Sequence, residues 1–142
     1  MQRVAIVGAG KIGQMIADLL VHSGDYEVAV IDKSTEQLER LQGGVPVERL
    51  AIDVNDPQAV AAALRGRYAV LSAAPFQVTG KIAEAAAMAG VHYLDLTEDV
   101  ANTRRVRQLA TTATTAFIPQ CGLAPGFITI VGYDLAKDFE SL

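Results

Sequence analysis

Six short apolar runs alternate with stretches of helical periodicity along almost the whole chain. The apolar runs, which are rich in β-branched residues, span 3–8, 27–32, 47–53, 68–74, 91–96 and 115–120. The helical stretches between them span 11–23, 34–42, 56–65, 77–89 and 99–113. Strands joined by helices run parallel, because each helix returns the chain to the edge where the preceding strand began. We therefore predict an α/β fold, a doubly wound parallel sheet of about six strands with helices on both faces.

Residues near the predicted helix ends support this interpretation. Ser34 suits the N-cap of the second helix, and Asp56 followed by Pro57 suits the start of the third. Gly90 suits the C-terminal end of the fourth. The first helix is predicted to pack its apolar face against the sheet, a face made of Ile12, Ile16, Leu19 and Leu20.

Composition and charge argue against several classes of protein. The chain has 142 residues, 51% of them hydrophobic, so one core and one globular domain are expected. A net charge of −4, with one basic cluster at 104–107, argues against nucleic-acid binding, and we interpret that cluster as a solvated helix face. The apolar runs are far shorter than the roughly 20 residues that span a membrane, and the start lacks a secretory cleavage site. We therefore expect a cytoplasmic protein with no membrane partner.

Three glycines follow the first predicted strand with the spacing of a dinucleotide-binding loop. In "VAIVGAGKIG", Gly8 permits the tight turn, Gly10 lets a pyrophosphate approach the backbone, and Gly13 lets the helix pack closely on the strand. The helix that begins near Lys11 points unpaired N–H groups and its positive dipole end toward the phosphates. Because the motif lies between a strand and a helix, it predicts a Rossmann-type cofactor site.

Asp32 ends the second predicted strand about two dozen residues after the loop begins. A carboxylate there accepts hydrogen bonds from the adenosine ribose hydroxyls and repels a 2′-phosphate, so NAD is the preferred cofactor. Lys33 and Ser34 are able to contact a 2′-phosphate, so NADP stays open. The alternative is that Asp32 only organises the turn beside Ser34.

Asp53 ends the third predicted strand on the same sheet edge. It is placed to reach the adenine amino group, and Val54 offers adenine an apolar wall. The alternative is that Asp53 and Asp56 only organise the turn and cap the next helix.

The carboxyl ends of the later strands should face the nicotinamide end of the cofactor. After the fourth strand, Ala73, Ala74 and Pro75 are small and rigid enough to let the cofactor pass close to the backbone. After the fifth, Asp95, Thr97 and Glu98 bring two carboxylates and a hydroxyl toward a substrate site, and Glu98 is a candidate acid or base. The same residues also fit a helix-capping arrangement.

Cys121 follows the sixth predicted strand, where turn-forming residues redirect the chain. It is the only cysteine, and with two distant histidines it suits neither an internal disulfide nor a zinc site, so we expect no metal. A nucleophilic cysteine needs a cationic or histidine partner, which the local sequence lacks. Packing, a role in lining the nicotinamide pocket and covalent catalysis all stay open for Cys121, in decreasing order.

Five segments in order resemble the cofactor-binding domain of the saccharopine dehydrogenase-like family, which includes saccharopine reductases and lysine 6-dehydrogenases. They are "VAIVGAGKIG", "AIDVNDPQAVAAAL", "YAVLSAAPF", "GVHYLDLTED" and "CGLAPGF". The resemblance implies hydride transfer between a nicotinamide and a carbon that bears an amino-acid nitrogen. It assigns the pyrophosphate to Gly8, Gly10, Lys11, Ile12 and Gly13, the ribose to Asp32, the adenine to Asp53 and Val54, and the nicotinamide ribose to Ala73, Ala74 and Pro75.

Two departures from the family pattern affect this interpretation. Saccharopine reductases have an acidic residue where this chain has Ala124, so lysine 6-dehydrogenase-like members are closer at this position. Family members also continue into a substrate and dimerisation domain. We therefore expect residues 1–120 to form the dinucleotide-binding domain, and 121–142 to lead toward a domain that recognises an amino-acid substrate and forms a homodimer. The chain alone is expected to be inactive.

Two other kinds of function are compatible with the same motifs. One is a non-catalytic NAD-sensing module, which shares the glycine loop, the acidic residue and the length. The other is a dimerisation domain with a vestigial nucleotide site. The "APF" loop and the "CGLAPG" segment favour the oxidoreductase.

Overall fold

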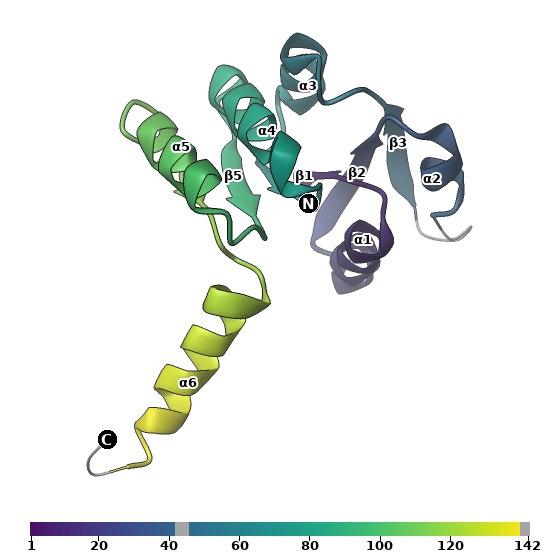
Figure 1. Ribbon diagram of the computed structural model, residues 1–142. Coiled ribbons are helices and arrows are strands. Elements are labelled where there is room, and N and C mark those ends of the chain that lie inside the picture. The colour runs from purple at the N-terminus through teal and green to yellow at the C-terminus, as the bar shows by residue number, and fades with distance from the viewer. Residues whose placement is uncertain (42–45, 140–142) are drawn as a thin grey trace.

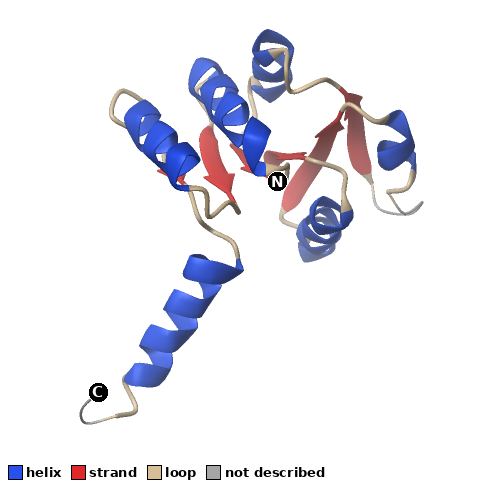
Figure 2. Cartoon of the chain, in the orientation of Figure 1, coloured by secondary structure: helices blue, strands red, loops and turns tan. Residues whose placement is uncertain are grey.

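A computed structural model describes residues 1–41 and 46–139 of the chain, and within them six parallel strands form one sheet (Figure 2). The strands are β1 (Gln2–Val7), β2 (Tyr26–Asp32), β3 (Val47–Ala51), β4 (Ala69–Ser72), β5 (His92–Asp95) and β6 (Phe117–Ile118). Their order across the sheet is β3-β2-β1-β4-β5-β6. This order is the doubly wound arrangement with its reversal between β1 and β4, so the predicted fold class is confirmed.

Helices connect the strands in the predicted alternation (Figure 1). They are α1 (Lys11–Ser23), α2 (Thr35–Glu39), α3 (Pro57–Leu64), α4 (Phe76–Ala89), α5 (Val100–Ala110) and α6 (Ile128–Ala136), with the wide turn η1 (Leu123–Phe127) before α6. The predicted second helix reached residue 42, which lies outside the described residues. The sixth strand is shorter than predicted at both ends, and at its C-terminal end Pro119 has no N–H to donate to the sheet.

The predicted helix caps are confirmed. The Ser34 hydroxyl accepts the N–H of Gln37 at 3.2 Å at the start of α2. One carboxylate oxygen of Asp56 accepts two N–H groups in the first turn of α3. Gly90 ends α4 in the left-handed conformation, with φ of 67°.

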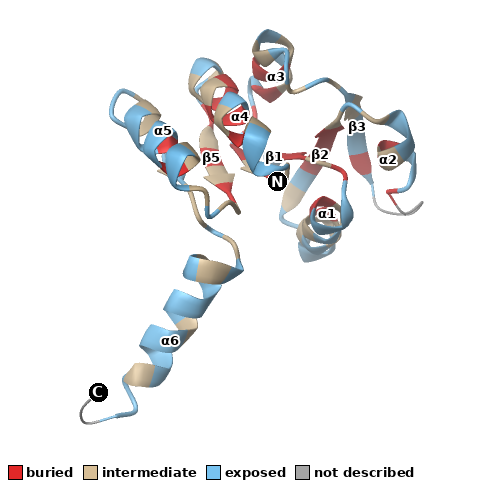
Figure 3. Cartoon of the chain, in the orientation of Figure 1, coloured by how far each residue is buried: buried red, intermediate tan, exposed pale blue. Residues whose placement is uncertain are grey.

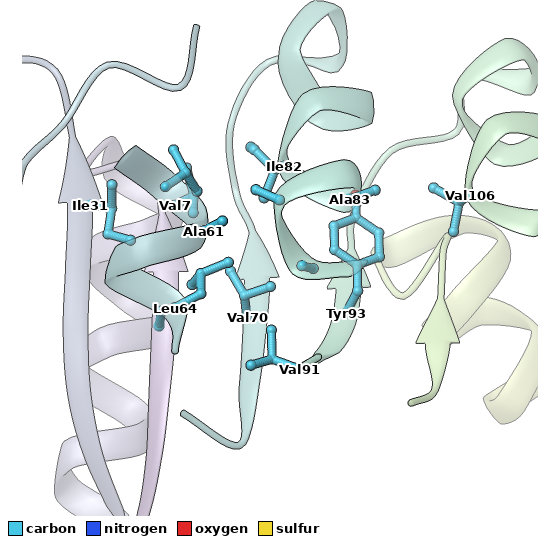
Figure 4. Close-up of a cluster of buried hydrophobic side chains, with 14 residues drawn as sticks. Val7, Ile31, Ala61, Leu64, Val70, Ile82, Ala83, Val91, Tyr93 and Val106 are labelled. Atoms are coloured by element: carbon cyan, nitrogen blue, oxygen red, sulfur yellow. The ribbon is translucent and has the colours of Figure 1, made fainter. Parts of the chain in front are cut away.

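The core lies on both faces of the sheet, because alternate residues of each strand point in opposite directions. In β1, Ala5 and Val7 face a cluster built with α3, α4 and α5 (Figure 4), whereas Val4 and Ile6 face a second cluster built with α1 and α2. The ends of the inner strands are therefore held rigidly between two layers of helices.

The predicted apolar face of α1 is partly wrong. Ile16 and Leu20 pack against the core, but Ile12 and Leu19 are 58% and 67% exposed. The fully buried positions of this helix are small residues, Gly13 and Ala17. The helix approaches the sheet most closely at these small residues, whereas Ile12 and Leu19 point toward solvent.

The helix α6 projects away from the sheet, and most of its length is exposed (Figures 1 and 3). Its apolar side chains include Ile130 and Tyr133, each 71% exposed.

The predicted solvated face at 104–107 on α5 is confirmed, because its three arginines are exposed and only Val106 is buried. Among the described residues, no helix has the length and apolar character needed to cross a membrane.

Candidate functional site

The glycine loop connects the end of β1 to α1 under tight steric limits. Gly8 has φ of 110°, a conformation that residues with a Cβ rarely adopt, and a Cβ there would lie 2.9 Å from the carbonyl oxygen of Ala73. A Cβ on Gly13 would lie 1.8 Å from the carbonyl oxygen of Gly8. Both close contacts bring α1 and the loop after β4 against the carboxyl end of β1, as the spacing predicts for these two glycines.

The start of α1 is open toward solvent. Gly10 is its N-cap and supplies no side chain to bind the first N–H groups, which have no partner within the helix. Within residues 1–41 and 46–139, a Cβ built on Gly10 meets no atom within 4 Å, unlike one built on Gly8 or Gly13. Free N–H groups at a positive helix end, beside a position without a side chain, fit a phosphate group.

The Asp32 carboxylate connects β2 to the glycine loop. Its Oδ2 accepts the N–H of Ala9 at 2.8 Å, and its Oδ1 accepts the N–H of Ser34 at 2.9 Å. Gln14 donates its side-chain amide to the carbonyl oxygen of Ala9 at 2.9 Å, so Ala9 is held on both sides. The predicted turn role of Asp32 is confirmed, but each oxygen retains a lone pair, so the carboxylate is still able to accept a ligand hydroxyl.

A pocket of about 160 Å³ lies beyond the carboxyl ends of β1, β2 and β4 and beside the turn after β3. Its lining includes seven of the twelve residues that sequence assigned to the cofactor, namely Gly8, Asp32, Lys33, Asp53, Val54, Ala74 and Pro75. The other five lie outside its lining, in the turn from Gly10 to Gly13 and at Ala73. Four lining residues were not predicted: Val7, Ile31, Asn55 and Val78.

Asp53 organises one wall of this pocket together with Asn55. The backbone N–H and the side-chain amide of Asn55 both donate to Asp53 Oδ1 at 2.9 Å, and Lys81 donates to Asn55 Oδ1 at 2.6 Å. The backbone N–H of Asn55 holds the pKa of the Asp53 carboxyl below its ordinary value, and the Asn55 amide, Lys33 and Lys81 lower it further. The predicted turn role of Asp53 is therefore confirmed, and Asn55, two residues after an aspartate, was detectable as an Asx turn.

The loop after β5 shows the predicted capping arrangement. Asp99 is the N-cap of α5 and accepts the N–H of Asn102 at 2.7 Å, while Thr97 Oγ1 accepts the N–H of Asp99 at 3.1 Å. Asp95 is 1% exposed, so it is not free to contact a substrate. Glu98 is exposed on this loop and remains a candidate acid or base only through its position.

Cys121 is an exposed free thiol at the carboxyl end of β6. Its Sγ donates to the carbonyl oxygen of Ile118 at 3.1 Å. Partial burial raises the pKa of the Cys121 thiol, and the negative charge of Asp95 raises it further. The thiol is therefore held protonated at neutral pH, which argues against nucleophilic catalysis by Cys121.

The strand order, the glycine loop and the acidic residue at the end of β2 define a dinucleotide-binding Rossmann domain. The chain belongs to the saccharopine dehydrogenase family, because residues 4–119 match the sequence profile of the saccharopine dehydrogenase NADP binding domain. The predicted family resemblance is thereby confirmed. The chain is a nicotinamide-cofactor-binding domain of an NAD(P)-dependent oxidoreductase family.

Solved structures share this fold at low sequence identity. Saccharopine dehydrogenase (L-Glu forming) from Saccharomyces cerevisiae is 18% identical with a TM-score of 0.86, and the match covers 97% of this chain and 31% of that one. Pen from Bacillus thuringiensis is 16% identical with a TM-score of 0.73, covering 83% and 48%. UDP-glucuronic acid 4-epimerase from Bacillus cereus, solved with NAD, is 12% identical with a TM-score of 0.66, covering 83% and 55%. This chain thus spans about a third to a half of the length of these proteins.

Proposed function

We propose that this chain holds NAD(H) for hydride transfer to or from a carbon that bears an amino-acid nitrogen. When bound, the cofactor would supply the hydride. The chain's own residues bind and orient the cofactor at the carboxyl ends of β1 to β4. The observation that carries the proposal is the conjunction of an uncapped α1, open space at Gly10 and a pocket beside Asp32.

Each part of this edge has a matching role. The free N–H groups at Lys11, Ile12 and Gly13 would bind the pyrophosphate, and Asp32 would accept the hydroxyls of the adenosine ribose. The adenine would lie against Val54 and beside Asp53 in the 160 Å³ pocket. The loop at Ala73, Ala74 and Pro75 would lie along the nicotinamide ribose.

The preference for NAD over NADP depends on Asp32, whereas the description of the family profile names NADP. Hydrogen bonds from Ala9 and Ser34 hold the Asp32 carboxylate at the pocket wall, where its charge repels a 2′-phosphate. Lys33 lines the same pocket and is the residue that would attract that phosphate. The preference is therefore a balance between two adjacent side chains of opposite charge.

Separate calorimetric titrations with NADH and NADPH test the cofactor, and Lys33→Ala tests the balance. The proposal predicts that NADH binds about tenfold or more tightly than NADPH to the unsubstituted chain. Lys33→Ala should weaken NADPH more than NADH, because it removes the cation and leaves Asp32 in place. Tighter binding of NADPH would overturn the NAD preference, and binding of neither would overturn the proposed function.

The amino-acid substrate and the homodimer are parts of the same proposal that rest on family membership, and a cytoplasmic location is proposed beside them. The yeast enzyme is about three times as long as this chain, so we place substrate recognition and dimerisation beyond the cofactor domain. A spectrophotometric assay with NAD⁺ and lysine or saccharopine should show no turnover by residues 1–142 alone, and turnover with one of them when these residues are joined to a substrate domain of this family. Turnover in neither form would favour the NAD-sensing alternative if NADH still binds.

A further inference from the structure

Asp95 is a buried carboxylate that the cofactor pocket does not use. It ends β5, is 1% exposed and accepts three hydrogen bonds. The Tyr93 hydroxyl donates to Oδ2 at 2.9 Å, and the N–H groups of Thr97 and Gln120 donate to Oδ1 at 3.0 and 3.1 Å. A buried carboxylate is costly unless donors surround it, so this set of donors accounts for how the fold tolerates Asp95.

Two hydrogen bonds connect Asp95 to a segment 25 residues further along the chain. We call residues 119–122 the exit turn, because the chain leaves the sheet there and continues toward α6. The Asp95 side chain binds the N–H of Gln120, and its backbone carbonyl accepts the N–H of Cys121 at 2.8 Å. The carboxylate therefore joins the carboxyl end of β5 directly to the exit turn.

The exit turn adopts a conformation that its sequence does not favour. Gln120 has φ of 63°, in the left-handed region that is disfavoured for a residue with a Cβ. A Cβ on Gly122 would lie 2.8 Å from the carbonyl oxygen of Leu96, so the turn is pressed against the residue that follows β5. In this conformation the N–H of Gln120 is bound by the Asp95 carboxylate, which therefore helps to hold the turn.

We propose that Asp95 is a positioning residue, which acts through Gln120 and Cys121 to fix the exit turn against the end of β5. It thereby sets the direction in which the chain leaves the cofactor-binding edge of the sheet toward α6. The exit turn borders the same sheet edge as the pocket, where nucleotide ligands bind in open parallel sheets. The effect of the exit turn on the nicotinamide half of the site rests on the proposed function. The contact between Asp95 and the exit turn does not depend on that function.

Native-state amide hydrogen exchange, measured by NMR on the cofactor-free chain, tests the proposal. Asp95→Ala should raise exchange at Gln120 and Thr97 by about tenfold or more relative to Val30, a core amide of β2, because local release exposes only the amides that Asp95 binds. A merely structural role would raise all three by the same factor through global unfolding. An equal rise at Gln120 and Val30 would therefore overturn the proposal.

Asp95→Asn is the matched control, because its remaining oxygen is able to accept both N–H groups while its amide faces the Tyr93 hydroxyl. It should keep exchange at Gln120 within about threefold of the unsubstituted chain. A rise as large as that of Asp95→Ala would contradict the assignment of these bonds to Oδ1. If Asp95→Ala does not fold, Asp95→Ser replaces it, since the shorter hydroxyl does not reach Gln120. Glycine adopts positive φ freely, so adding Gln120→Gly should reduce the effect of Asp95→Ala or Asp95→Ser on exchange at position 120.

Exchange in the absence of cofactor reports on the exit turn whether or not NADH binds. A separate NADH titration of Asp95→Ala then tests the link to the site, and we expect weaker binding if the nicotinamide half lies against the turn. Local release at Gln120 without any NADH binding by the unsubstituted chain would support the positioning role and contradict the proposed function.

Discussion

The Asp32 carboxylate accepts the backbone N–H of Ala9 at 2.8 Å, across 23 residues of sequence. This bond joins the end of β2 to the glycine loop after β1. The same carboxylate binds the N–H of Ser34, so it fixes the two turns that form one side of the pocket. Asp32 thus has a structural role within the chain itself as well as a proposed role toward the ribose.

Substituting Asp32 should therefore affect stability even without cofactor. Asp32→Ala leaves the N–H groups of Ala9 and Ser34 without their acceptor, and we expect a loss of about 1–3 kcal/mol in the free energy of unfolding. Urea denaturation followed by circular dichroism measures this loss. Lys33→Ala is the matched control at the adjacent exposed position, and it should change stability by less than about 0.5 kcal/mol. Equal effects of the two substitutions would contradict the structural role of Asp32.

The hydrogen bonds around Asp53 predict an acid dependence. Because the N–H of Asn55 and then its side-chain amide lower the folded-state pKa of Asp53 below 3.8, the unfolded chain takes up a proton there first as the pH falls. This contribution to stability is present above about pH 4 and is lost as the pH falls through the folded-state pKa. Carbon-13 NMR should show Asp53 titrating below 3.8, and Asn55→Ala should move the midpoint upward. The rise should be partial, because the backbone N–H remains.

The exposed apolar residues of α6 predict self-association of the isolated chain. Ile130 and Tyr133 are each 71% exposed on one helix, and apolar surface of this kind drives weak association. Sedimentation velocity should show an average mass that rises with concentration, and Ile130→Ser should reduce the rise. Gln108→Ser, at an exposed position of α5, serves as the control and should leave it unchanged. A monomer at all concentrations would contradict this expectation.

Local sequence signals predicted the elements of the fold because their causes are local. The glycine spacing, the Asp56-Pro57 start of α3 and the Gly90 end of α4 each act within a few residues. The depth at which α1 packs is set by Gly13 against Gly8, so the exposure of Ile12 depended on tertiary structure. The apolar pattern alone could not reveal it.

The sequence predicted which residues lie near the site better than it predicted the contacts that these residues make. Strand ends placed Asp32 and Asp53 on one edge, and the pocket brings them together. The bond from Ala9 to Asp32 and the left-handed Gln120 have no signature in the sequence, because each depends on a segment more than 20 residues away. Val78 lines the pocket from the first turn of α4, a tertiary placement that the sequence pattern did not predict.

The proposed cofactor approaches the backbone at Gly10, and an NADH titration of Gly10→Ala tests this approach most directly. A Cβ at Gly10 meets no atom of the described residues within 4 Å, and the φ of −70° suits alanine, so the variant should retain its stability. Gly13→Ala, whose Cβ would meet Gly8, should instead lose stability. This variant shows that urea denaturation detects a steric clash in the glycine loop. We predict that Gly10→Ala unfolds at the same urea concentration as the unsubstituted chain but binds NADH at least about tenfold more weakly. Unchanged NADH affinity in a stable Gly10→Ala variant would contradict this placement of the cofactor.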